Sequence, residues 1–313
     1  MSLPIPHRKA QHGTGKAHIH TFGNQTHFNE LSYTYPLKLL SPSIPSHGEI
    51  PTSIAYVLSY GGGLVSGDRI DLSVQVEEGA GLVFLTQGST KVFKSRTLTE
   101  RHRLSAITPS TSSNATSQHL TATLSPSSLF LLLPDPVTPF ESASYTQIQT
   151  FTLTPSSSLI LLDWFTSGRM ARGEEWAFER YYSRNEVFVD GKRVARDVML
   201  LEQTPDKQDT HGLPVRRLKD RLSPYACYAT LLLFGPLTQS LIASFQTSYN
   251  QISQRQRAEP ENLIWSFSAL TESNGACVRV AGTETELVKD WLKNRLEGLG
   301  QIVGEDVYNK AFV

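Results

Sequence analysis

Apolar and polar residues alternate along much of the first two thirds of the chain. Ile70, Leu72, Val74 and Val76 occupy every second position of one segment, which is the period of a half-buried β-strand. Strand signals that repeat without helical periodicity between them predict a continuous β-rich body over residues 17–200, with no Rossmann-like sheet. The runs, separated by proline, glycine or serine clusters, are AHIHTF, SIAYVLSY, RIDLSVQV, LVFLT, HLTATL, SLFLLL, YTQIQTFTL and LILLDWF.

The pattern changes in the last third of the chain. Residues 229–235, ATLLLFG, predict a buried strand. Two further strand-like runs flank Ser273-Asn274-Gly275 and predict a β-hairpin. Apolar residues at four-residue steps predict one face of a helix that ends before Pro260: Leu237, Leu241, Phe245 and Tyr249.

A last helix is predicted after the hairpin. Residues 283–286, Thr-Glu-Thr-Glu, have the form of a capping box, in which side chains at both ends of the first turn bond to free backbone N–H groups. The helix that follows is expected to bury Leu287, Trp291 and Leu292.

These patterns predict the organisation of the whole chain. Residues 1–16 have the character of a loose leader, residues 17–228 form a β-rich body, and residues 229–313 form an α+β part that packs on it. A serine- and threonine-rich insertion near residues 108–118 lacks apolar periodicity and predicts a mobile surface loop. The predicted fold class is mainly β, with stacked sheets or a solenoid-like β body and a smaller α+β C-terminal part.

Composition narrows the function classes. The 313 residues include 29 basic and 29 acidic side chains, so no overall field attracts nucleic acid or anionic lipid. The N-terminus lacks the apolar core of a signal peptide, and no run approaches the roughly twenty apolar residues of a membrane helix. Cys227 and Cys277 have no metal-binding spacing and fit a reducing compartment. We therefore expect a cytoplasmic protein without nucleic-acid or membrane partners.

A glycine cluster precedes one of the predicted strands. Gly61, Gly62 and Gly63 follow the run IAYVLSY, and glycine-rich loops can hold phosphate groups with backbone N–H groups. A phosphate loop of the Walker type needs lysine and serine or threonine after its last glycine, followed by a helix. Here Gly67 precedes Asp68 and a strand pattern, so the glycines indicate a tight turn or bulge.

Candidate chemistry is sparse. His18 and His20 share one face of a predicted strand and could place two imidazoles on a metal ion, although two polar residues on a half-exposed strand are the commoner interpretation. No G-x-S-x-G element is present, so a hydrolase with a serine nucleophile is not supported. The sequence therefore predicts no catalytic residues.

Charged residues gather in two further segments. Glu174 and Glu175 lie among arginines in GRMARGEEWAFER, where mixed charges usually solvate or pair weakly. Lys91, Lys94 and Arg96 have the character of a basic strand edge, unless a partner binds them. Asp135 lies between two prolines in a stiff loop, where a turn residue and a channel-lining carboxylate are equally compatible with the sequence.

Four segments in order resemble the urease accessory protein D family. They are GGLVSGD (62–68), TQGSTKVFKS (86–95), LLLPDPVTPF (131–140) and DWFTSGRMARGEEWAF (163–178). The sequence departs from the family pattern at Ser66, where glycine is common, and at Phe93, where tyrosine is common. The likeness thins before residue 30 and after about residue 200.

The resemblance implies a non-catalytic chaperone of urease maturation. Such a protein would bind the urease apoprotein, join accessory proteins F and G, of which G is the GTPase, and support nickel delivery. It would have no cofactor of its own, and nickel would be cargo in transit. The transfer path or partner surface would include Asp68, Gln87, Lys91, Asp135, Arg169, Glu174 and Trp176.

Two other function classes remain open from the residues alone. A carbohydrate-active enzyme on a β-solenoid or sandwich would require carboxylates that converge in a groove. A plain protein-interaction module would need no metal chemistry.

Overall fold

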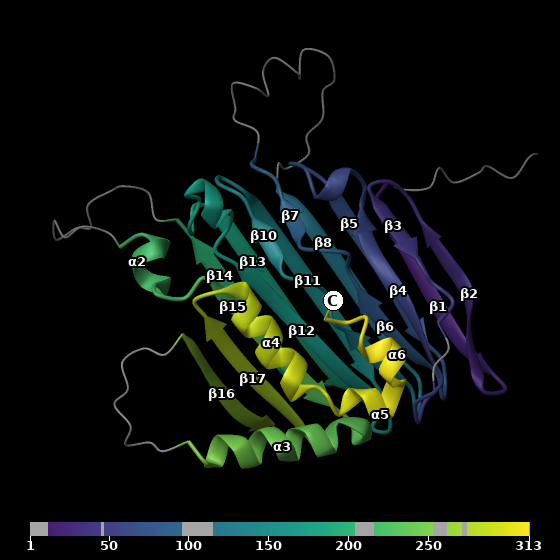
Figure 1. Cartoon of the computed structure of the whole chain (residues 1–313). Coiled ribbons are helices and arrows are strands. Elements are labelled where there is room, and N and C mark those ends of the chain that lie inside the picture. The colour runs from purple at the N-terminus through teal and green to yellow at the C-terminus, as the bar shows by residue number, and fades with distance from the viewer. Residues whose placement is uncertain are drawn as a thin grey trace, which may run out of the picture.

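The computed structural model describes residues 12–44, 47–95, 115–203, 216–252, 262–270 and 274–312. It contains two β-sheets that face each other, and helices that cover part of one sheet (Figure 1). The predicted mainly β fold class is confirmed.

The first sheet, sheet A, has seven strands in the order β14-β13-β11-β8-β5-β1-β2. The pairs from β1 through β13 are parallel, and the two outermost pairs, β1 with β2 and β13 with β14, are antiparallel. The strands are β1 (Thr14–Phe22), β2 (Gln25–Tyr33), β5 (Arg69–Val76), β8 (Thr116–Leu124), β11 (Ser144–Leu153), β13 (Arg180–Val189) and β14 (Lys192–Glu202).

The second sheet, sheet B, has the main order β16-β17-β15-β12-β9-β6-β4-β3, and β7 and β10 extend it beside β12. Its middle strands β4, β6, β9 and β12 are parallel. The strands are β3 (Leu37–Leu40), β4 (Thr52–Ser59), β6 (Gly81–Leu85), β7 (Thr90–Val92), β9 (Leu129–Leu132), β10 (Val137–Pro139), β12 (Ser158–Thr166), β15 (Cys227–Phe234), β16 (Leu263–Leu270) and β17 (Gly275–Gly282).

The chain winds between the two sheets. Strands β4, β6, β9 and β12 in sheet B alternate along the sequence with β5, β8, β11 and β13 in sheet A. Each strand therefore pairs in parallel with a strand one coil earlier, as in a solenoid. Between β1 and β14 the described residues contain only two short 3₁₀ turns, η1 (Tyr60–Gly62) and η2 (Met170–Arg172), and no β-α-β unit. The prediction of a β-rich body without a Rossmann-like sheet is confirmed.

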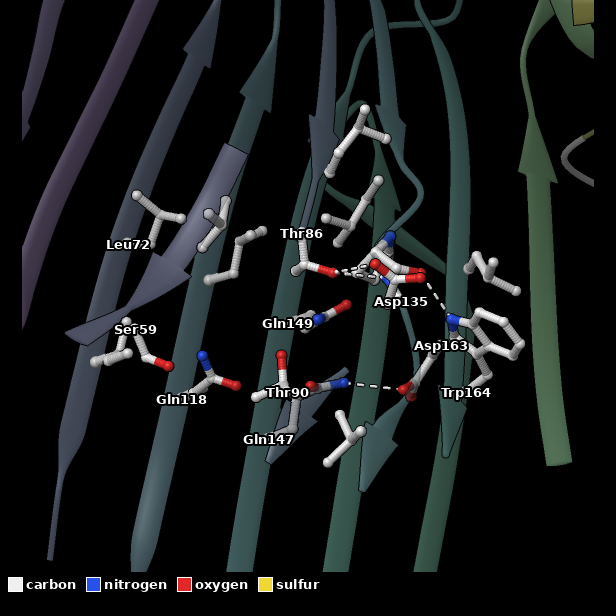
Figure 2. A pocket seen from close by; sticks show the side chains of 18 of the residues that line it. Ser59, Leu72, Thr86, Thr90, Gln118, Asp135, Gln147, Gln149, Asp163 and Trp164 are labelled. Carbon is white, nitrogen blue, oxygen red and sulfur yellow. Dashed lines mark hydrogen bonds between the residues drawn. The ribbon is translucent and has the colours of Figure 1, made fainter. Parts of the chain in front are cut away.

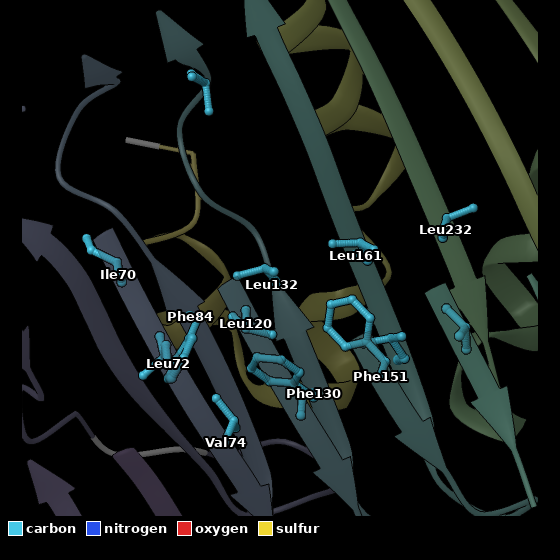
Figure 3. Close-up of a cluster of buried hydrophobic side chains, with 14 of the residues drawn as sticks. Ile70, Leu72, Val74, Phe84, Leu120, Phe130, Leu132, Phe151, Leu161 and Leu232 are labelled. Carbon is cyan, nitrogen blue, oxygen red and sulfur yellow. The ribbon is translucent and has the colours of Figure 1, made fainter. Parts of the chain in front are cut away.

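Apolar side chains from both sheets fill the space between them (Figure 3). The alternating residues of β5 point inward as predicted, and Ile70, Leu72, Val74 and Val76 are all buried. Phe84 and Phe130 of sheet B meet edge to face with ring centroids 5.2 Å apart. Such burial is the main source of stability for a β body of this kind.

Helices cover the outer side of sheet B in the lower half of Figure 1, and form a second core with it. They are α3 (Gln239–Asn250), α4 (Thr285–Arg295), α5 (Leu299–Val303) and α6 (Glu305–Tyr308), and a further short helix, α2 (Leu218–Leu222), lies at the side. Strand β12 is consequently buried on both faces: Leu159, Leu161 and Phe165 point to sheet A, and Ile160 and Leu162 point to the helices.

The C-terminal elements agree with the sequence in type but not in every contact. The helix predicted before Pro260 is α3, and β16 pairs with β17 in the predicted hairpin. The predicted capping box is wrong, because α4 begins without a side-chain cap hydrogen bond. The buried residues of α4 are Val288 and Leu292, whereas Leu287 is 37% exposed.

Several predicted boundaries shift in the structure. Strand β1 begins at Thr14, inside the predicted leader, and β8 begins at Thr116, inside the predicted insertion. Residues 1–11 of the leader and residues 108–114 lie outside the described residues. The C-terminal part shares a sheet with the body, since β15 pairs with β12. None of the helices that the structure describes has the length and apolar character needed to span a bilayer.

Candidate functional site

The four sequence segments singled out above converge at one end of the sandwich, which we call the rim. Strand β7 pairs with β10, and β10 pairs with β12, so residues 86–95, 131–140 and 163–178 lie side by side. The first segment joins them through Leu64, whose N–H donates to the carbonyl of Lys91 at 2.8 Å and whose carbonyl accepts from Phe93 at 2.9 Å. Segments separated by up to a hundred residues therefore form one surface.

Asp68 closes the glycine-rich turn. Its carboxylate oxygen Oδ2 accepts a hydrogen bond from the N–H of Val65 at 2.9 Å, and its own N–H donates to the carbonyl of Val65 at 3.0 Å. Gly63 is required next to it, because a Cβ at that position would lie 2.7 Å from the carbonyl oxygen of Lys91. The glycines thus bring the turn against β7, and Asp68 fixes its shape.

Asp135 holds the loop that follows β6. Its Oδ2 accepts from the N–H of Gly88 at 2.9 Å and from the hydroxyl of Thr86 at 3.2 Å, and its N–H donates to the same hydroxyl oxygen at 2.8 Å. Gln87 lies in this loop with an exposed side chain. Asp135 also lines the cavity described below, so it is both a loop residue and a cavity carboxylate.

Arg169 and Glu174 form a bidentate ion pair in the fourth segment. The Arg169 Nε atom donates to Glu174 Oε2 at 2.7 Å, and a second bond joins the guanidinium to Oε1. Glu174 also accepts from the N–H of Glu141 at 3.2 Å, and the guanidinium lies 3.9 Å from the ring centroid of Phe140. The hydrogen bond from Arg169 holds the pKa of Glu174 below its ordinary value.

The remaining predicted residues of the rim differ in exposure. Lys91 is exposed on β7, and two apolar residues of the rim segments, Val65 and Met170, are also exposed. Trp176 is only 1% exposed and packs edge to face against Phe165. Trp176 therefore lies in the core between the sheets.

A cavity of about 80 Å³ lies between the sheets behind the rim (Figure 2). Its polar lining comes from both sheets and from the rim loop, and includes Ser59, Thr86, Gln118, Asp135, Gln149 and Asp163. This volume accommodates several water molecules, each of which needs roughly 10–15 Å³. At this end of the sandwich, polar side chains therefore lie among the apolar ones, which include Leu72 and Leu132.

Asp163 is a carboxylate in the cavity between the two sheets. It occupies an inward position of β12 between Leu161 and Phe165, and three side chains donate hydrogen bonds to it: Gln147 at 3.0 Å, Asn185 at 2.7 Å, and Ser183. Burial raises the pKa of Asp163, and these donors oppose that effect.

Other buried oxygens beside Asp163 have no hydrogen-bond partner. They are Gln149 Oε1, Asn185 Oδ1 and the Tyr181 hydroxyl. Buried polar atoms normally find protein or water partners, so these atoms indicate a site that takes up water. The sequence patterns did not reveal this site. The available signal was a single carboxylate inside the otherwise apolar run LILLDWF.

A second, open cleft of about 590 Å³ adjoins the cavity and shares Asp135 and Trp164 with it. Its other wall is the beginning of α4, with the carboxylates Glu284 and Glu286. Asp135 thus lies between an exposed acidic cleft and the polar interior.

The two histidines considered as metal ligands do not form a metal site with others. His18 Nε2 lies 2.8 Å from Glu77 Oε1, and the His20 ring lies 6.1 Å from that of His27. Within the described residues no three His, Cys, Asp or Glu side chains are grouped so that they could hold a metal ion.

Comparison with known proteins gives a consistent match along the chain. The family model described as "UreD urease accessory protein" matches residues 11–310. Urease accessory protein 4 of Cryptococcus neoformans var. grubii is 37% identical over 310 residues, which cover 96% of this chain and 94% of that protein. Urease accessory protein D of Arabidopsis thaliana is 31% identical over 315 residues, covering 94% and 99% respectively. Urease accessory protein UreD of Sorangium cellulosum is 33% identical over 305 residues, covering 97% and 86%.

Proposed function

The chain belongs to the UreD family of urease accessory proteins, and from this premise we propose that it is a maturation chaperone that scaffolds the accessory complex on apo-urease and supports nickel delivery. The family is one of accessory proteins and not of enzymes. The proposed partners are the urease apoprotein and accessory proteins F and G, and the proposed location is the cytoplasm.

The observation that carries this proposal is the convergence of four separate segments on the rim. Each segment contributes one turn or short strand to the same surface, and the exposed side chains of these segments include Val65, Lys91 and Met170. Methionine is enriched at protein interfaces relative to the rest of the surface. The rim is the surface that we assign to the urease or accessory-protein partners.

The carboxylates behind the rim support a role in nickel transfer. Asp135 and Asp163 line the same cavity, and the adjoining cleft adds Glu284 and Glu286. Oxygen ligands without a closed cage hold a hydrated divalent ion loosely, whereas a closed site of nitrogen and sulfur ligands would retain nickel. We assign to nickel the route from the acidic cleft past Asp135 to Asp163, with Asp68 and Glu174 supporting the rim around it.

Two other functions fit the site less well. None of these three relatives carries an enzyme name, which disfavours a carbohydrate-active enzyme. A plain interaction module would not require a carboxylate, Asp163, in a cavity between the sheets together with buried oxygens that lack partners.

The scaffold role is tested by copurification. The tagged chain, coexpressed with the urease apoprotein and accessory proteins F and G of the same organism, should isolate a complex that contains apo-urease. A Met170→Asp/Lys91→Glu variant should lose a partner because both changes lie on the rim, while its melting temperature stays close to that of the unmodified chain. Failure of the unmodified chain to copurify with any of these proteins would contradict the scaffold role.

A further inference from the structure

A second exposed surface lies on the outer side of sheet A, away from the helices. We call it the outer hairpin face and define it by Tyr182, Arg184, Glu186, Arg193, Arg196, Val198 and Leu200 of β13 and β14. Helices α3–α6 pack on sheet B, so within the described part of the chain no helix covers this side of sheet A (Figure 1). Among the described strands β14 pairs with β13 only, so it forms one margin of the sheet.

The centre of this face is apolar and exposed. Val198 is 45% exposed and Leu200 is 50% exposed, and they stand on the same side of β14 because they are two residues apart. The register places Leu200 opposite Tyr182 and Val198 opposite Arg184. Two large aliphatic side chains beside a tyrosine form a compact apolar patch on an otherwise polar surface.

An excess of positive charge borders the apolar patch. The carboxylate of Glu186 forms ion pairs with Arg193, Arg184 and Arg196, with N–O distances of 3.1, 3.4 and 3.5 Å respectively. The Glu186 side chain is only 13% exposed, whereas the three arginine side chains are 31–50% exposed. One carboxylate cannot neutralise three guanidinium groups, so this cluster presents a surplus of two positive charges to solvent.

We propose that the outer hairpin face docks a protein partner whose surface presents carboxylates next to apolar side chains. Val198 and Leu200 would be buried at the centre of the contact. The three arginines would bind the partner's carboxylates at the edge of the contact, where charges guide association and orientation. The proposal rests on the proposed function in that the partner is a member of the urease maturation complex, and it adds a docking surface separate from the rim.

Charge and shape disfavour other occupants. A second copy of this chain, related by twofold symmetry, would bring two clusters of surplus positive charge together. Nucleic acid would leave Val198 and Leu200 against phosphates. A bilayer would require a broad apolar face, whereas this face exposes only two large aliphatic side chains, between charged ones.

The test measures the affinity of the full-length chain for three purified proteins of the same organism: apo-urease, accessory protein F and accessory protein G. Two variants change the face, Leu200→Asp and Arg193→Glu/Arg196→Glu. The matched control is Ser73→Glu, an exposed position on the same side of sheet A in strand β5. Melting temperature and circular dichroism establish that each variant is folded.

We expect one of the three affinities to weaken by about tenfold or more in both variants, as for a residue near the centre of an interface, and to be unchanged in the control. The affinity for that protein should also weaken as salt is raised. Equal binding by wild type and both variants would overturn the inference and leave the maturation role standing. If none of the three binds the wild type, both fail. The inference would also be overturned if the wild type self-associates and Leu200→Asp abolishes this. It would likewise be overturned if the wild type binds DNA or anionic vesicles and the double arginine variant abolishes that binding.

Discussion

At the scale of single residues, Asp163 illustrates how a carboxylate can be kept inside a β sandwich. Gln147, Ser183 and Asn185 donate to its two oxygens, and each donor comes from sheet A while Asp163 comes from sheet B. These bonds offset part of the cost of removing the charge from water. Periodicity could not reveal this arrangement, because it depends on which strands of the other sheet lie opposite.

The buried carboxylate gives a pH-dependent stability with a definite sign. Burial raises the folded-state pKa of Asp163 above the unfolded value, so the protonated folded form is favoured and stability falls as pH rises between the two pKa values. Asp163→Asn removes this dependence. The melting temperature of the variant relative to wild type should therefore be higher at pH 7 than at pH 4. Thermal unfolding at both values checks this, and a difference independent of pH would contradict a raised pKa.

The Arg169–Glu174 pair has the opposite dependence. The folded-state pKa of Glu174 is lowered by Arg169, so the pair stabilises the fold above the ordinary glutamate pKa of about 4.3 and is lost as pH falls through the lower folded-state value. Glu174→Gln should lower the melting temperature at pH 7, and the loss should shrink below pH 4. Glu141→Gln is the control, because it removes a carboxylate but keeps the backbone N–H that donates a hydrogen bond to Glu174. A melting temperature equal to wild type at pH 7 would show that the pair contributes nothing to stability.

At the scale of elements, local patterns predicted type and approximate position. The alternation at residues 70–76 and the four-residue steps in α3 each correspond to one buried face. In helix α4 the buried face is shifted from the predicted one, with Val288 buried in place of Leu287. The cause is the glycine that precedes the helix, Gly282. A Cβ at Gly282 would lie 2.6 Å from Val288 Cγ2, so α4 packs directly over this glycine and turns Val288 and Leu292 inward. This close approach is a tertiary contact, so a capping pattern in the sequence could not predict it.

The orientation of α4 gives a direct stability prediction. Leu292 is fully buried at 0% exposure, so Leu292→Ala should reduce the free energy of unfolding by about 2–5 kcal/mol. Leu287→Ala, on the exposed side of the same helix, should change it by no more than about 0.5 kcal/mol. Urea unfolding of both variants distinguishes the observed face from the predicted one. A larger loss at Leu287 would contradict the structure.

At the scale of the whole molecule, winding between two sheets explains why distant motifs meet. Each coil crosses from one sheet to the other. Segments at equivalent positions of neighbouring coils therefore lie side by side, even when they are far apart in the sequence. The sequence predicted strands but not this pairing, because parallel partners such as β4 and β6 are separated by a complete strand of the other sheet. The rim could be anticipated only through the family resemblance, since no local period links residues 62–68 to residues 163–178.

The route proposed for nickel depends on the same winding, which brings Asp135 and Asp163 to the lining of one cavity (Figure 2), while Asp135 also lines the open cleft. Asp135→Asn and Asp163→Asn keep an oxygen acceptor and similar volume while removing the charge that attracts a divalent ion. Asp306→Asn, at an exposed position of α6, is the matched control.

The most direct test of the account is the nickel content of urease matured with each variant. Urease is coexpressed with accessory proteins F and G and one form of the chain, purified, and analysed for nickel per active site, together with the amount of complex formed. We expect Asp135→Asn and Asp163→Asn to form the complex normally but to yield urease with several-fold less nickel, and Asp306→Asn to match wild type. Urease with wild-type nickel content from both cavity variants would contradict a role of the cavity in nickel transfer.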